Sequence, residues 1–353
     1  MAADELIFDE GVLAPLPVIE FQGYRAAARH AGLAVLPWRA EWLAATASEV
    51  EARASAPGPG EGRFQQALVH LQKSRAATWR DLFAAWQLLE PAGRLLVCGG
   101  NELGITSAVK RLAGELGQTP RILSNRRHGR IVGFERGSGP GPAAAEPTRI
   151  DLPLAGGRCE PLHAEPGVFS AKRLDTGTQL LLDTLGEQPA PHRILDMGCG
   201  IGPLGVAALA HWPEARALLL DSDMRAVASA GQNLAALGME ARAAIHWWDA
   251  EEPCPEKDFD LALVNPPFHA GKAVDLRPAH AMFARLAEAL AVGGRALIVA
   301  NRTLPYERAL ESAGTMEVVG RGRGYKIISF TRRARVRPPR HRQPSSVRPS
   351  RKP

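Results

Sequence analysis

The chain has 353 residues, of which 45% are hydrophobic and 23% charged, so we expect a soluble, core-forming protein long enough for two domains. No run approaches the roughly 18 apolar residues that a membrane span needs. The N-terminus, MAADELIFDE, is acidic where a secretory signal is basic, so we expect a cytoplasmic protein. The four cysteines form no CxxC pair and the ten histidines are scattered, so we expect no metal site.

The net charge of +6 is concentrated at the C-terminal end of the sequence. Residues 332–353 hold nine Lys and Arg residues and no acid, whereas the rest of the chain carries 34 basic and 37 acidic side chains. This Pro-rich segment has no apolar periodicity, so we expect a basic, disordered tail. Two interpretations stay open for it: an electrostatic arm for nucleic acid, or a segment that only improves solubility.

Strand-like and helix-like segments alternate through the second half of the chain, which predicts a parallel sheet covered by helices. The expected strands are RILDM (193–197), RALLLD (216–221), FDLALVN (259–265), GRALIVA (294–300) and YKIISFT (325–331), with Ala- and Leu-rich helices among them. The Gly- and Pro-rich stretch at 136–148 predicts a linker between a domain at 1–135 and a domain at 149–331.

An internal comparison suggests that the fold is duplicated. GRLLVCGGNELGITSA (93–108) aligns with HRILDMGCGIGPLGVA (192–207) at an offset of 99 residues, and both predict an apolar strand, a glycine turn and a helix. At this offset Val97 stands opposite Asp196, and the first half contains no Asn-Pro-Pro sequence. We expect a degenerate first copy, with chance similarity of two strand-turn-helix units as the alternative.

The strongest motif is LDMGCGIG at 195–202, in which Asp196 ends a predicted strand and three glycines follow before a helix. Glycines there let the backbone turn sharply and let a ligand approach it closely. An acid ahead of the glycines suits a cationic amino-acid ligand better than a diphosphate, so the motif predicts S-adenosylmethionine. The candidate cofactor-binding residues here are Asp196, Gly198, Cys199, Gly200 and Gly202. A purely structural glycine turn is the alternative.

Two further acids follow the next predicted strands. Asp221 closes the strand after the glycine motif, where a carboxylate can accept from both ribose hydroxyls of a nucleoside, while Asp223 could instead cap a helix. Asp249 comes after the third strand, where it could accept from an adenine amine. We add Asp221, Ser222, Asp249 and Ala250 to the candidate cofactor site.

The sequence Asn265-Pro266-Pro267-Phe268 ends the fourth predicted strand. By itself it is a strand terminator, but after the glycine motif it predicts a catalytic site for an exocyclic amine. The Asn265 side-chain oxygen and the Pro266 carbonyl can each accept one N–H of that amine, which directs its nitrogen lone pair at the methyl donor. Pro267 stiffens the loop, and Phe268 can stack on an extruded base.

With PGVFSAKRLDTGTQLLLDTL (166–185), NPPFHAG (265–271) and IVANRTLPY (298–306), the chain resembles the bacterial ribosomal RNA small-subunit methyltransferase C family and its large-subunit sister. That resemblance implies two tandem class I, Rossmann-like α/β domains, with a seven-stranded, mainly parallel sheet in the second and a degenerate first copy. It implies that segment 166–185 covers the cofactor and borders the target base. Phe169, Ser170 and Asp175 thus become candidate substrate-binding residues, and Thr178 a candidate cofactor residue. Asp175 or Thr176 could also cap a helix.

The resemblance implies an enzyme that methylates the N2 amine of a guanine in ribosomal RNA, with 16S RNA of the small subunit favoured over 23S RNA. We expect a monomer whose partner is ribosomal RNA within the small subunit or an assembly intermediate. Adenine N6 and protein glutamine N5 remain alternative acceptors, because their amines pose the same electronic problem. A non-catalytic RNA-binding assembly factor is a further alternative, which the intact second-half motifs disfavour.

Overall fold

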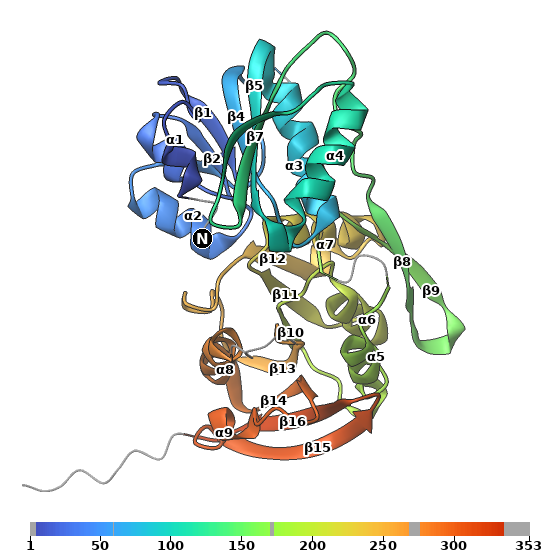
Figure 1. Ribbon diagram of the computed structural model, residues 1–353. Coiled ribbons are helices and arrows are strands. Elements are labelled where there is room, and N and C mark those ends of the chain that lie inside the picture. Colours follow the sequence, from blue (N-terminus) through green and yellow to red (C-terminus); the bar gives the residue numbers. More distant parts are fainter. Residues whose placement is uncertain (1–4, 59, 170–172, 268–275, 335–353) are drawn as a thin grey trace, which may run out of the picture.

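The computed structural model describes residues 5–58, 60–169, 173–267 and 276–334, and Figure 1 shows two stacked α/β units in that part of the chain. The first unit is built on a seven-stranded sheet with the order β3-β2-β1-β4-β5-β7-β6. Its strands are β1 (Val18–Phe21), β2 (Leu33–Val35), β3 (Glu51–Arg53), β4 (Phe64–His70), β5 (Leu89–Gly100), β6 (Arg121–Arg126) and β7 (Gly129–Glu135). Its helices are α1 (Arg25–Arg29), α2 (Arg39–Ala47), α3 (Arg75–Leu88) and α4 (Ile105–Leu116).

The second unit repeats this topology with the order β12-β11-β10-β13-β14-β16-β15. Its strands are β10 (Arg193–Met197), β11 (Arg216–Asp221), β12 (Ala243–Trp247), β13 (Phe259–Val264), β14 (Leu290–Asn301), β15 (Gly314–Gly322) and β16 (Tyr325–Arg332). Its helices are α5 (Thr176–Leu182), α6 (Pro203–His211), α7 (Met224–Ala236), α8 (Arg277–Ala289) and α9 (Glu307–Leu310). Only β16 is antiparallel to its two neighbours, so the sheet is mainly parallel, as the sequence predicts.

Helices cover both faces of the second sheet (Figure 1) because its central strands are apolar on both sides. Ile194 belongs to the core cluster that includes residues of α5, α6 and α7, and its neighbour Leu195 belongs to the cluster that includes residues of α8 and α9. This alternation fixes the register of β10, since a shift by one residue would exchange the two faces.

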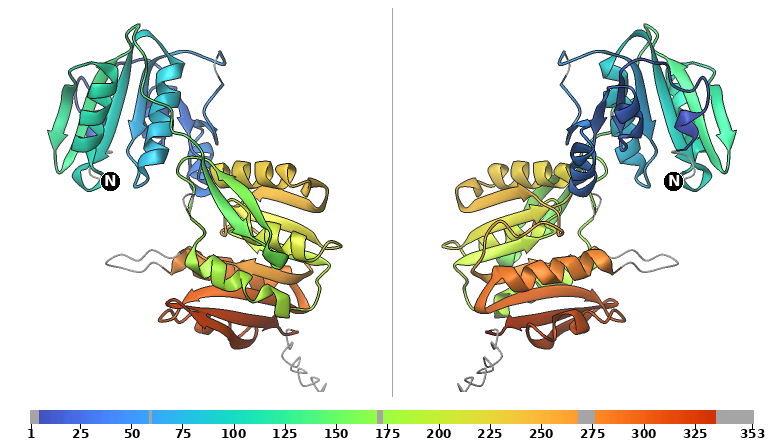
Figure 2. Two further views of the ribbon diagram at one scale, coloured as in Figure 1. Left: turned by 90° about the vertical axis from the view of Figure 1, so that its right-hand side faces the viewer. Right: turned by 90° about the vertical axis from the view of Figure 1, so that its left-hand side faces the viewer.

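A hairpin of β8 (Thr148–Pro153) and β9 (Cys159–Ala164) connects the two units and lies along the flank of the second (Figure 2). Its backbone is fixed to α7 because Asn233 accepts from the His163 N–H at 2.8 Å and donates to the His163 carbonyl at 2.9 Å. Leu152 and Leu162 complete one core cluster of the second unit.

The duplication is real, but the alignment at an offset of 99 residues is wrong. By sheet order β10 corresponds to β1, whereas β5, which contains Val97, corresponds to β14. Glu20 is the counterpart of Asp196. Each is the second-to-last residue of its strand, and each pairs with both neighbouring strands: Glu20 with β2 and β4, and Asp196 with β11 and β13. The mistaken alignment arose because β5 and β10 are both apolar strands that run into a glycine turn and a helix.

Candidate active site

The glycine turn between β10 and α6 has the conformation that its sequence requires. Gly198, Gly200 and Gly202 have φ of 77°, 57° and 89°, in the left-handed region that side chains disfavour. A Cβ at Gly198 would lie 3.2 Å from Met282 Cε and 3.8 Å from the Asn265 carbonyl oxygen. The turn therefore lies next to the end of β13, so the two principal sequence motifs meet.

Asp196 is fully buried at the end of β10. Its Oδ2 accepts the Gly205 N–H at 2.8 Å, which ties the strand to the first turn of α6, whereas Oδ1 has no hydrogen-bond partner among the described residues. Burial raises the pKa of this carboxyl group to about 7, and the nearby charge of Asp221 adds to the rise. A buried carboxylate oxygen without a partner is costly, so this atom fits a cationic group in a bound ligand.

Asp221 closes β11 beside the same turn. Its two oxygens accept the Gly200 N–H at 2.7 Å and the Asp223 N–H at 2.9 Å, so one side chain organises both loops. Burial raises the pKa of Asp221 to about 6, although these two hydrogen bonds act in the opposite direction and lower it. Asp223 is the N-cap of α7, as its spacing suggested, and Ser222 lies between the two acids.

Asp249 follows β12 in a partly buried position, with Ala250 next to it. Its Oδ1 accepts the Glu251 N–H at 3.0 Å, and its own N–H donates to Glu252 Oε2 at 3.2 Å. Cys199 lies buried in the glycine turn, and burial raises the pKa of its thiol well above the usual value. Its neutral sulfur therefore packs rather than reacts.

The side chain of Asn265 is held by a segment 90 residues away in the sequence. Its Nδ2 donates to Asp175 Oδ2 at 3.1 Å and to Thr178 Oγ1 at 2.9 Å. The same Asp175 oxygen caps α5 by accepting from the N–H groups of Gly177 and Thr178 at 2.9 and 3.1 Å. Because Asn265 makes its contacts with Asp175 and Thr178 through Nδ2, its amide is oriented so that Oδ1 can accept from another group.

The remaining predicted site residues are placed less completely. Pro266 is buried and Pro267 exposed after β13, and Phe169 has 68% of its surface exposed. Ser170 and Phe268 lie outside the described residues. Tyr325 is a neighbour of this cluster that the sequence does not predict. A Cβ at Gly177 would lie 3.4 Å from its ring, and burial together with the charge of Asp175 raises its pKa. No local signal marks it, because β16, which lies between β14 and β15 and runs antiparallel to both, brings it there.

The first unit has a different arrangement at the equivalent edge. Glu20 accepts the N–H groups of Ala26 and Ala27 at 2.8 and 2.9 Å and pairs with His70 Nε2 at 2.8 Å. His70 stands where Asn265 stands in the second unit, one residue beyond the matching strand pair. A Cβ at Gly23 would lie 2.6 Å from the Glu20 carboxylate. A cavity of about 220 Å³ remains beside this pair, lined among others by Gly23 and Glu41. The first unit thus has a glutamate–histidine pair where the second has Asp196 and Asn265.

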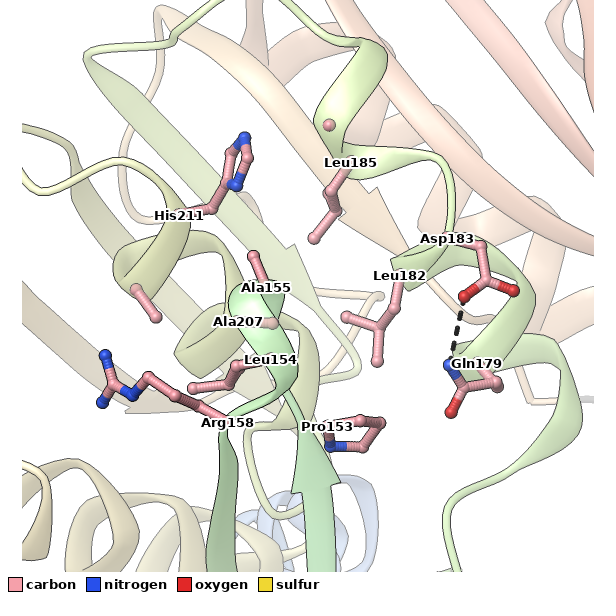
Figure 3. A pocket seen from close by; sticks show the side chains of 12 residues that line it. Pro153, Leu154, Ala155, Arg158, Gln179, Leu182, Asp183, Leu185, Ala207 and His211 are labelled. Atoms are coloured by element: carbon pink, nitrogen blue, oxygen red, sulfur yellow. Dashed lines mark hydrogen bonds between the residues drawn. The ribbon is translucent and has the colours of Figure 1, made fainter.

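A cavity of about 290 Å³ opens between the β8–β9 hairpin, α5 and α6 (Figure 3). Leu154, Leu182 and Leu185 point into it, and Arg158 and His211 lie at its border. None of the predicted site residues lines this cavity, so it is separate from the cluster around Asn265.

Within the described ranges, no helix is long and apolar enough to cross a membrane. The same ranges contain no group of three His, Cys, Asp or Glu side chains arranged for a metal ion.

Comparison with known proteins identifies the family. Residues 160–329 match the Methyltransferase small domain family. The chain is 35% identical over 303 residues to the ribosomal RNA small subunit methyltransferase C of Pseudomonas aeruginosa, covering 82% of this chain and 88% of that protein. The chain belongs to the ribosomal RNA small subunit methyltransferase C family. The Pseudomonas entomophila member is 36% identical over 281 residues, covering 78% of this chain and 81% of that protein.

A solved T. thermophilus 16S rRNA methyltransferase, RsmC, in complex with AdoMet and guanosine, has the same fold with a TM-score of 0.81. The two chains are 24% identical, and the match covers 94% of this chain and 92% of that one. The predicted family and the predicted tandem α/β fold are therefore confirmed, and with the family the expected class of enzyme, a methyltransferase.

Proposed function

We propose that this chain transfers the methyl group of S-adenosylmethionine to the exocyclic N2 amine of a guanine in 16S ribosomal RNA. The observation that carries the proposal is the orientation of the Asn265 amide by Asp175 and Thr178 next to the glycine turn. Family membership and the names of the relatives support the same reaction.

The chemistry follows from the weakness of the nucleophile. The lone pair of an exocyclic amine is delocalised into the ring, so the protein must hold the amine in position for the transfer. The N–C bond forms as the bond between sulfur and the methyl carbon breaks, and the methylated nitrogen then loses one proton to solvent. Asn265 Oδ1 and the Pro266 carbonyl accept one N–H each and direct the nitrogen at the methyl carbon. When bound, S-adenosylmethionine supplies a methyl group on a positively charged sulfur. Asp175 and Thr178 position Asn265 and do not themselves need to touch the base.

The acids at the edge of the second sheet fit that cofactor. The unpaired Oδ1 of Asp196 suits the cationic amino-acid end, and the left-handed glycines let the ligand approach the backbone. Asp221 and Asp249 follow the two strands outward from there, where carboxylates accept from ribose and adenine. Gly198, Cys199, Gly200, Gly202, Ser222 and Ala250 complete the proposed cofactor contacts.

The proposed substrate contacts include an exposed aromatic ring. Phe169 keeps 68% of its surface exposed although its neighbour Val168 is buried, which suits a ring that stacks on a base taken out of its helix.

We also propose that the chain is divided into a first domain, a linker, a catalytic domain and a tail, at 1–135, 136–148, 149–331 and 332–353. The end of β7 at Glu135 and the start of β8 at Thr148 support this division. We propose further that the enzyme acts as a cytoplasmic monomer without a metal.

The test is product identification with the purified full chain. Small ribosomal subunits from cells lacking the gene are incubated with S-adenosylmethionine carrying a labelled methyl group, and the digested RNA and protein are analysed by mass spectrometry. We expect the label in N2-methylguanine of 16S RNA. A parallel reaction uses large subunits from the same cells. Label in N6-methyladenine, in glutamine or in the 23S RNA of the large subunits would contradict the proposed acceptor, and no transfer to any fraction would contradict the reaction.

A further inference from the structure

The first unit contacts the proposed cofactor loops of the second unit through the residues that follow β2, here called the 37–39 segment. Its backbone pairs with the residues directly after Asp221. The Arg39 N–H donates to the Ser222 carbonyl at 2.9 Å, the Met224 N–H donates to the Pro37 carbonyl at 2.8 Å, and Trp38 forms an antiparallel bridge with Asp223. The loop that follows Asp221 is thus held by two interdomain backbone hydrogen bonds.

The indole of Trp247, at the end of β12, strengthens this contact. Its Nε1–H lies 3.1 Å from the Pro37 carbonyl oxygen and 3.0 Å from the Ser222 carbonyl oxygen, so one donor joins the two units. Its ring packs edge-to-face with Trp42 of α2 at 5.4 Å between centroids. This geometry adds an aromatic contact to the backbone pairing.

The side chain of Arg39 reaches the loop that carries Asp249. Its Nε and Nη2 each donate to Glu252 at 2.9 Å, and the guanidinium lies 5.0 Å from the ring centroids of both Trp42 and Trp247. Glu252 in turn accepts the Asp249 N–H at 3.2 Å. The hydrogen bonds from Arg39 hold the pKa of Glu252 below its usual value, so the pair stays charged.

A buried polar network joins the same edge of the first sheet to the start of α7. Arg225 and Asp223 form a nearly fully buried ion pair at 2.7 Å, and Arg225 Nη1 donates to Gln72 Oε1 at 3.2 Å. Gln72 and Gln22 each donate to Asp81, at 2.7 and 2.8 Å. Gln22 and Gln72 follow β1 and β4, so the carboxyl edge of the degenerate sheet, where the second sheet has its cofactor motif, is used here to hold the other unit.

We propose that the first unit positions the cofactor-binding loops of the second: the 37–39 segment fixes the loop of Asp221, and Arg39 fixes the loop of Asp249 through Glu252. This inference rests on the proposed function, because it takes these acids as contacts of the nucleoside half of S-adenosylmethionine. Among the described residues, no interdomain hydrogen bond is made by Asp196 or the glycines, which we assign to the methionine half. Loss of the contact should therefore weaken binding of the cofactor without changing the transfer step itself.

The test compares Arg39→Ala with the wild-type full chain by calorimetric titration with S-adenosylmethionine. Losing two charge-assisted hydrogen bonds should weaken binding about tenfold. KM for the cofactor should rise in parallel, while kcat at saturating cofactor stays within about twofold. The matched control is Arg53→Ala, which removes the exposed pair of Arg53 with Glu61 in the same unit and should leave affinity unchanged.

Two conservative variants keep the test decisive if Arg39→Ala does not fold. Arg39→Lys keeps the charge and loses the bidentate geometry, and Trp247→Phe keeps a ring and loses the N–H shared by Pro37 and Ser222. Each should weaken cofactor binding by about threefold at a temperature well below its melting point. Wild-type affinity in the folded variants would overturn the inference, and so would a fall in kcat without a change in affinity. Failure of the wild-type chain to bind S-adenosylmethionine would instead overturn the proposed function.

Discussion

Replacing Asp175 by alanine separates the structural role of its carboxylate from its effect on Asn265. The change removes the N-cap of α5, which should cost about 1 kcal/mol of unfolding free energy and lower Tm by roughly 2–4 °C. It also removes one of the two acceptors that orient the Asn265 amide. A hydrogen bond to a charged group contributes about 1.5–3 kcal/mol. If that contribution is expressed in the transition state, kcat falls about 10- to 150-fold.

The assay is single-turnover methyl transfer at saturating S-adenosylmethionine, with the fraction of folded protein measured at the same temperature. Asp183→Ala is the matched control, because Asp183 follows the same helix, is exposed, and accepts a hydrogen bond from the Gln179 side chain at 3.2 Å, away from Asn265. It should keep wild-type kcat. Thr178→Val removes the other acceptor of the amide and keeps the cap, and should lower kcat about fivefold. An Asp175→Ala enzyme that is folded and fully active would refute the positioning role.

Three further outcomes follow from the glycine turn, the buried acid and the degenerate copy. Gly198→Ala places a side chain at φ 77°, so it should lower the unfolding free energy by roughly 1–2 kcal/mol and weaken cofactor binding. The control Gly114→Ala lies inside α4 with open space around it, so it should raise the unfolding free energy by roughly 0.5–1 kcal/mol. Thermal melts and cofactor titrations compare the two variants. Because burial raises the pKa of Asp196 to about 7, its neutral form favours folding most below the unfolded pKa near 3.8, and this contribution is lost as pH rises through about 7. Asp196→Asn should therefore flatten the fall in unfolding free energy across that window in urea titrations, and an unchanged slope would contradict the raised pKa. Glu20→Ala removes the carboxylate that accepts from the Ala26 and Ala27 N–H groups and pairs with His70, so it should lower Tm while cofactor affinity stays the same. A selective loss of affinity in the folded variant would argue against a degenerate copy.

The second sheet could be predicted closely from the sequence because its strands are apolar runs between amphipathic helices. The predicted ranges 193–197 and 216–221 coincide with β10 and β11. The first unit was harder, since β1, β2 and β3 are only four, three and three residues long. Runs that short carry little periodicity, and this is why the longer β5 was matched to the wrong strand.

The site was predictable where its chemistry lies in one continuous motif. Asp196 with its glycines and Asn265 with its prolines were recognised from local spacing, and the structure brings them together. The contacts that orient Asn265 come from a segment 90 residues away, and those that hold the Asp221 loop come from the other unit. No local pattern encodes such contacts, because they depend on strand order and on the packing of two sheets. The resemblance to the family supplied Asp175 and Thr178, but not what they do to the amide.

The most direct test of the account is methyl transfer by Asn265→Ala on under-methylated small subunits, measured together with S-adenosylmethionine affinity. The central claim is that Asn265 Oδ1 holds the amine of the base, so removing it should lower the single-turnover rate by about 100-fold or more while cofactor affinity stays within about twofold. A folded Asn265→Ala enzyme that transfers the methyl group at the wild-type rate would contradict the account.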